Sequence, residues 1–225
     1  MCFLARAAYG QDNALAAVTN PPDALPKRIL GIIPNYRTAP SLVNYRALTA
    51  GGKFQIALAD SDDRGTLIMA AAFAGLADLS KATPSFGTGM AGYSRYMGAA
   101  YGDLVIGNFM TEAIYPTLLH QDPRYFRRGT GSGWSRLCYA VGQTFWTHTD
   151  RGGSQFNFTE VLGNATAVAI SNAYVPDHRT AANAESKLAS QLAVDTMGNV
   201  MKEFWPDLDR KFRHKDRVAQ STPGR

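Results

Sequence analysis

The sequence predicts an all-α protein, folded as a compact bundle of five to seven helices with close, Gly- and Ala-rich helix packing. Apolar residues recur at helical spacing through most of the chain, and no stretch alternates polar and apolar residues as a half-buried strand does. Ala and the 21 Gly residues fall mainly in the least charged segments, which favours close helix–helix contact. With 225 residues, 45% of them apolar, the chain can bury a core without disulfides.

The chain divides into four segments. Residues 1–11 are interpreted as the remnant of a secretory signal peptide, because a short apolar start precedes an Ala-x-Ala pattern at Ala5 to Ala7. This stretch lacks a basic start and a long apolar run, so a frayed cytosolic N-terminus is the alternative. The remaining segments are a Pro-rich extended strap (12–40), whose Ile29 to Ile33 run docks onto the core, a helical domain (41–209) and a basic flexible tail (210–225).

Six helical segments follow one another in the domain. They are expected over residues 48–59, 64–80, 88–119 (long or broken), from near 132 through Gln143, 158–174 and 182–205. The stretch from Asp60 to Asp63 offers a cap for the second of them. Because that second segment is apolar on nearly every side, we expect it at the centre of the bundle. The tetrapeptides Gly92 to Arg95 and Gly133 to Arg136 begin similarly, which hints at a weak internal duplication.

The positive charge is concentrated at the C-terminus. The net charge is +5, yet residues 11–209 hold 16 Lys and Arg against 17 Asp and Glu. The tail is therefore either a solvated end or an attachment to an anionic membrane surface or polyanion, and specific nucleic-acid binding is not expected. The longest stretch without an ionised side chain, Val161 to Pro176, is shorter than a membrane-spanning helix needs.

The segment from His120 to Gly129 is the best candidate binding site. Its three arginines and two aromatic residues can clamp a phosphate or carboxylate, because the guanidinium fork matches two oxygens and stacks on rings. The candidate ligand-binding residues are Arg124, Tyr125, Arg127 and Arg128. In the alternative, structural interpretation, Asp122 caps a turn and pairs with a neighbouring arginine while the aromatic rings fill the core.

Two His-x-Asp pairs offer an alternative, catalytic interpretation. A hydrolase would gather His120, Asp122, His148 and Asp150 as its catalytic residues. A two-residue spacing on a helix sends side chains to opposite faces, so hydrogen-bonded histidines near helix ends compete with this interpretation. Residues Gly87 to Gly92 have the glycine spacing of a dinucleotide site, but no strand precedes them. We therefore expect no cofactor and no metal, and we find no nucleophile motif.

Polar residues also interrupt the apolar segment 158–174. Glu160, Asn164 and the neighbourhood of Ser171 share roughly one helical face. Since buried polar groups need partners, this face is expected to meet Glu112 or Asn108, either as packing or as part of a ligand-lined cleft.

Four sequence stretches carry a family resemblance. They are Gly31 to Arg37, Gly107 to Ala113, His120 to Tyr125 and Lys202 to Asp207. The chain resembles an uncharacterised family of predicted secreted or envelope proteins from soil bacteria such as acidobacteria, a family with no known activity. The resemblance implies export to the periplasm or outer envelope of a bacterium.

The expected function is a non-enzymatic, envelope-associated role, either structural or in binding an anionic or lipid surface. The alternatives are the periplasmic hydrolase described above and a bundle of small-residue helices within the membrane.

Overall fold

The computed structural model describes residues 25, 28–40, 42, 45–175, 177 and 180–220. Within them the all-α prediction is confirmed, with six helices packed together. They are α2 (Ala50–Ser61), α3 (Arg64–Leu79), α4 (Gly89–Asn108), α6 (Gly133–Gly142), α7 (Phe158–Tyr174) and α8 (Ala181–Gln220). The predicted remnant of a signal peptide and the first half of the strap lie outside the described residues.

The expected long or broken helix over residues 88–119 is continuous but changes type. Helix α4 passes into a π-helical segment, η2 (Phe109–Ile114), and then into the short α5 (Tyr115–Leu118). Pro116 explains the change, because it has no N–H to donate to the carbonyl of Glu112 four residues earlier. The Tyr115 N–H instead reaches the carbonyl of Met110, five residues back. The result is an extra residue in one turn, immediately where Glu112 points inward.

Three small sheets join the loops to the helices. Strand β1 (Arg28–Ile29) pairs antiparallel with β2 (Ile33–Pro34), β3 (Thr38–Ala39) pairs parallel with β4 (Tyr125–Phe126), and β5 (Trp146–His148) pairs antiparallel with β6 (Ser154–Phe156). These strands were not expected from the sequence. The described part of the strap therefore forms a hairpin and then lies against a segment almost ninety residues away.

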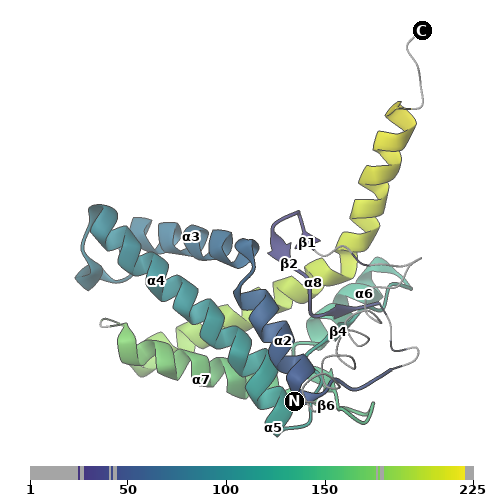
Figure 1. The fold of residues 1–225 in the computed structure, drawn as a ribbon, viewed down its shortest axis with the longest axis horizontal. Coiled ribbons are helices and arrows are strands. Elements are labelled where there is room, and N and C mark those ends of the chain that lie inside the picture. The colour runs from purple at the N-terminus through teal and green to yellow at the C-terminus, as the bar shows by residue number, and fades with distance from the viewer. Residues whose placement is uncertain are drawn as a thin grey trace, which may run out of the picture.

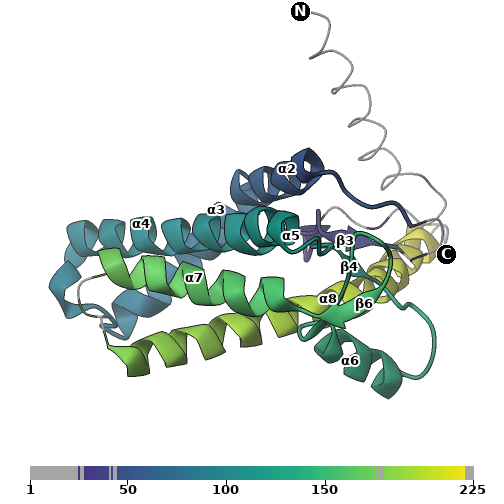
Figure 2. The ribbon, with the colours of Figure 1, turned by 90° about the horizontal axis from the view of Figure 1, so that it is seen from below.

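The helices pack in layers around α4. Helix α3 packs along one side of α4 and α7 along another, while α8 packs against α7 (Figures 1 and 2). Small residues allow these close approaches: a Cβ on Gly163 of α7 would lie 2.9 Å from Thr111 Cγ2 and 3.3 Å from the Met110 carbonyl carbon. A turn of 3₁₀ helix, η1 (Pro84–Phe86), lies between α3 and α4.

The expectation that residues 64–80 lie at the centre is wrong. Helix α3 buries Ala70 and Ala74 completely against its neighbours, but Leu76 and Leu79 are 64% and 83% exposed. The face of α3 that carries the alanines lets its backbone approach α4 closely, whereas Leu76 and Leu79 face outward. Helix α3 therefore forms an edge of the bundle.

Helix α8 runs further than the sequence predicts. It continues past Pro206 to Gln220, so residues 210–220 are helical where a flexible tail was expected. Pro206 lacks the N–H that would bond the carbonyl of Lys202, and prolines within helices cause bends. Figure 1 shows α8 following the bundle and then turning away from it.

Candidate ligand cavity and its charged end

Arg124 of the predicted binding loop is held by the protein's own oxygens. Its Nε and one terminal nitrogen donate to the two Asp122 oxygens at 2.9 and 2.6 Å, and the same terminal nitrogen donates to the carbonyl of Arg46 at 2.6 Å. The Tyr45 hydroxyl donates to Asp122 Oδ2 at 2.9 Å. The Asp122–Arg124 pair of the structural interpretation is thus present, and it joins the loop to the start of the helical domain.

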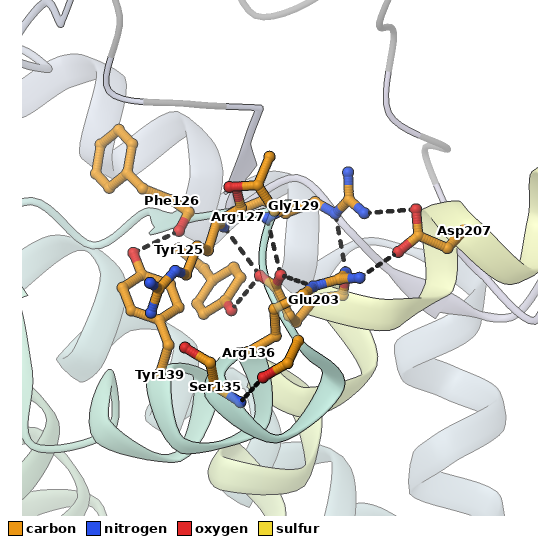
Figure 3. Close-up of polar contacts among 12 residues, drawn as sticks. Tyr125, Phe126, Arg127, Gly129, Ser135, Arg136, Tyr139, Glu203 and Asp207 are labelled. Carbon is orange, nitrogen blue, oxygen red and sulfur yellow. Dashed lines mark hydrogen bonds and ion pairs between the residues drawn. The ribbon is translucent and has the colours of Figure 1, made fainter.

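The rest of the loop encloses Glu203 of α8 (Figure 3). This fully buried carboxylate accepts hydrogen bonds from the Tyr125 hydroxyl at 2.8 Å, the Gly129 N–H at 2.9 Å and the Arg128 N–H at 3.0 Å. Arg136 Nε donates to it at 2.7 Å. Burial raises the pKa of Glu203, but these donors outweigh burial and hold the pKa below its usual value.

Arg127 and Arg136 also hold α8 where it bends. Both donate to the carbonyl of Glu203, at 2.9 and 2.7 Å, and both pair with Asp207, at 2.8 and 2.7 Å (Figure 3). Burial alone would raise the pKa of Asp207. The hydrogen bonds from its arginine partners outweigh burial and lower the pKa to about 2. Arg128 lies over the Tyr139 ring at 5.8 Å. All four predicted ligand-binding residues therefore contact the protein itself in this structure.

The two His-x-Asp segments lie side by side, and they bring His120 Nδ1 to 3.9 Å from Asp150 Oδ2. The Asp122 N–H donates to the His148 carbonyl at 2.8 Å, and the Asp150 N–H donates to the His120 carbonyl at 2.9 Å. The His120 side chain is 84% exposed, and Asp150 pairs with Lys53 at 2.7 Å. His148 packs against Phe126, and burial lowers its pKa despite the nearby Asp122. The described residues contain no group of three or more acidic, His or Cys side chains that could hold a metal ion.

An elongated cavity of about 430 Å³ lies between α3, α4, α8 and the β1–β2 hairpin. Lining residues along α4 and η2 run from Tyr96 to Glu112, a length of about 24 Å at about 1.5 Å per residue. Phe73 of α3 and Val194 of α8 line it and are 38% and 48% exposed, so the cavity meets solvent between these two helices. Its apolar walls include Ile29, Ile33, Phe86, Ala100, Leu104 and Met201.

Charged side chains from four segments meet at one end of this cavity. The carboxyl groups of Glu112 in η2 and Asp60 in α2 interact with each other, and Arg37 of the strap donates to Glu112 Oε1 at 3.3 Å. Lys202 of α8 also lines this end. The Asp60 and Glu112 side chains are both more than nine-tenths buried. Burial, together with the charge of Asp60, raises the pKa of Glu112 well above its usual value.

A second pair of acidic side chains lies beside the first. Asn164 of α7 donates to Glu160 Oε1 at 3.2 Å and to Asp195 Oδ2 at 3.0 Å. Burial and the nearby Asp195 raise the pKa of Glu160 to about 8. Burial and the charge of Arg37 lower the pKa of Lys202 to about 8. The polar face of α7 thus meets α8, whereas its expected partner Asn108 donates to Ser61 Oγ at 3.3 Å.

Comparison with known proteins does not assign the chain to a family. No match was found among protein-family models, curated protein sequences or solved structures. The resemblance to an envelope family therefore stays a prediction, and function has to be argued from the cavity.

Sequence reasoning found part of this site. It singled out Glu112, Glu160 and Asn164, because polar residues are conspicuous on apolar helices. It missed Arg37, Asp60, Asp195 and Lys202. Asp195 directly follows the apolar Leu192 to Val194, a signal of the same kind that could have been used. Nothing in the sequence around Arg37 marks it as a partner of Glu112, since the place of this part of the strap depends on the β3–β4 pairing with a distant segment.

Proposed function

We propose that this protein is a non-enzymatic binding protein for an elongated amphiphilic small molecule. The observation that carries the proposal is the cavity, which has apolar walls and ends at a buried charged cluster. An amphiphile would place its apolar chain against the walls and its polar head at the cluster.

The cavity has the size and lining of a small-molecule site. Pockets that bind small molecules measure roughly 300–1,000 Å³, are mostly apolar, and contain a few convergent polar groups; the cavity of about 430 Å³ fits this description. Its length favours a chain-like ligand over a compact one. Each methylene group removed from water on binding contributes about 0.8 kcal/mol, so a single aliphatic chain gains affinity from the walls alone.

The first experiment tests whether the apolar walls bind a chain. Ala100 of α4 lines the cavity, and the Ala100→Trp side chain would fill part of it. Decanol binding, measured by isothermal titration calorimetry, is expected for the unmodified protein and should weaken by about tenfold or more in A100W, because the bound chain and the indole compete for the same space.

Ala91→Trp is the matched control. Ala91 lies on the same helix but is exposed and does not line the cavity, so A91W should bind decanol like the unmodified protein. Equal loss in both variants, or no decanol binding by the unmodified protein, would contradict the proposed function.

The other functional interpretations from the sequence stay predictions. Export was inferred from residues 1–11, which lie outside the described part of the chain, and envelope association from the basic segment 210–225 and the family resemblance. Among the residues of the alternative hydrolase, Asp122 and Asp150 already pair with Arg124 and Lys53. The cavity is lined by neither histidine pair, so the binding proposal does not depend on them.

A further inference from the structure

The charged end of the cavity contains more acidic groups than cationic ones. Asp60 and Glu112 form one acidic pair, and Arg37 and Lys202 are the cations that interact with it. Asp195 also lines the cavity, and it forms a second pair with Glu160, which lies behind the lining and interacts with the same cations. Asp63, the N-cap of α3, lies near Asp60 but is paired with Arg28. With protons on Glu112 and Glu160, the two remaining carboxylates balance the two cations. The cluster can therefore exchange one of these protons for one more positive charge and stay neutral.

The hydrogen-bond acceptors of the cavity that lack a donor also favour a positively charged ligand. Asp60 Oδ1 and Glu112 Oε2 are buried and receive no N–H or hydroxyl donor from elsewhere in the described residues. A proton shared between the two carboxyls would satisfy both atoms in the absence of a ligand. Gln191 Oε1, further along the lining of α8, is likewise an acceptor without a donor. The buried cavity atoms that lack partners within the described residues are thus all acceptors.

A primary ammonium group supplies what these atoms need. It carries three N–H donors, no acceptor and a positive charge. Hydrogen bonds between an ammonium group and carboxylates are charge-assisted and about twice as strong as neutral ones. A hydroxyl group offers one donor, and a carboxylate head offers none and adds to the negative charge.

We propose that the charged end of the cavity binds the ammonium head of a single-chain amine, and that the ligand displaces the proton shared by Asp60 and Glu112. This inference rests on the proposed function, since it assumes that the apolar walls hold the chain. No bond is made or broken in the ligand, and the displaced proton passes to solvent.

The test compares three decyl compounds that differ only in the head: decylammonium, decanol and decanoate. Decylammonium is expected to bind about tenfold or more tightly than decanol, and decanoate more weakly than both. Calorimetry in buffers of different ionisation enthalpy should show proton release with decylammonium and none with decanol. The preference for the amine should grow as the pH rises from about 6 to about 8, because Glu160, whose pKa burial and Asp195 raise to about 8, becomes more ionised over this range and adds negative charge to the cluster.

Three variants separate the head site from the walls. Glu112→Gln keeps a donor toward Asp60 but removes the carboxylate, so it should abolish most of the amine preference while decanol binding stays unchanged. Lys202→Met removes a positive charge beside the head and should tighten decylammonium binding. Glu185→Gln, on an exposed position of α8, is the control and should change nothing.

Two outcomes would overturn the inference in different ways. If decanoate binds most tightly, the head site is built around Arg37 and Lys202; the ammonium inference then fails and the proposed function stands. If none of the three compounds binds, the proposed function fails with it.

Discussion

Glu160 couples the stability of this protein to pH. Burial and Asp195 raise the pKa of Glu160 from 4.5 to about 8 in the folded state. The folded state therefore holds a proton that the unfolded state releases in this range. Stability from this group is fully present below about pH 4.5 and is lost as the pH rises through about 8. Lys202 acts in the opposite sense above about pH 8, because its folded pKa is lowered from 10.5 to about 8 and the neutral amine is the form that burial favours.

The Glu160→Gln variant should lose part of this pH dependence. Between about pH 5 and about pH 8, one excess proton in the folded state corresponds to a slope of about 1.4 kcal/mol per pH unit in the free energy of unfolding. The amide side chain of this variant does not titrate, so urea denaturation at several pH values should give a shallower decline for E160Q than for the unmodified protein.

Glu185→Gln again supplies the comparison, since Glu185 is exposed and should leave the slope unchanged. An unaltered slope in E160Q would show that Glu160 titrates in the folded state much as it does in the unfolded chain.

At the scale of single residues, the sequence predicts polar positions on apolar helices but not their partners. Glu112 and Glu160 stand out because each lies in a stretch of apolar neighbours. Their pairing with Asp60 and Asp195 depends on how α2, η2, α7 and α8 pack, which local patterns do not encode. Arg124 to Arg128 were conspicuous for their charge, yet the partners of Arg127 and Arg136 lie on the last helix, more than sixty residues away in sequence.

At the scale of elements, helix positions follow from sequence more closely than tertiary pairings do. The expected segment 158–174 coincides with α7, and the interrupted helix over 88–119 is present with a π-helical turn where Pro116 withholds its N–H. The strands were missed because each has only two or three residues and is fixed by its partner. Helix α3 was misplaced because its apolar residues surround the axis, and only packing shows that the alanine face is the buried one.

Two glycine substitutions test how tightly the helices pack. At Gly163 of α7, an added Cβ would press on Thr111 and the backbone of Met110, so Gly163→Ala should destabilise the fold by about 1–3 kcal/mol. At Gly75 of α3, no atom lies within 4 Å of the added Cβ. Gly75→Ala should therefore stabilise the protein by about 0.5–1 kcal/mol through higher helix propensity. Urea denaturation measures both changes, and a Gly163→Ala variant as stable as the unmodified protein would contradict the close contact of α7 with η2.

At the scale of the whole molecule, α8 joins the cavity to the basic C-terminal segment. Lys202 faces the cavity, Glu203 is enclosed by the loop after β4, and beyond Pro206 the helix turns away from the bundle (Figure 1). No helix among the described residues is long and apolar enough to cross a membrane. Attachment to an anionic surface through residues 210–225, as the sequence suggests, is a separate prediction from ligand binding.

Removing residues 210–225 tests that attachment. The full chain should float with vesicles that contain phosphatidylserine at low salt and separate from them at high salt, because contacts between exposed charges are screened. The chain ending at Asp209 should not float, and neither should the full chain with phosphatidylcholine vesicles. Flotation that ignores both salt and the deletion would contradict attachment by the basic segment.

The arrangement of the buried charges also has a consequence for folding during synthesis. Arg37, Asp60, Glu112 and Glu160 leave the ribosome before Lys202 does, yet they interact with it across the finished core. A nascent chain that ends before α8 has three of the four acidic groups and only one of the two cations, and it has no helix to cover α7. It also lacks Asp195 and Lys202, which α8 contributes to the charged cluster. The final packing must therefore wait for the end of synthesis.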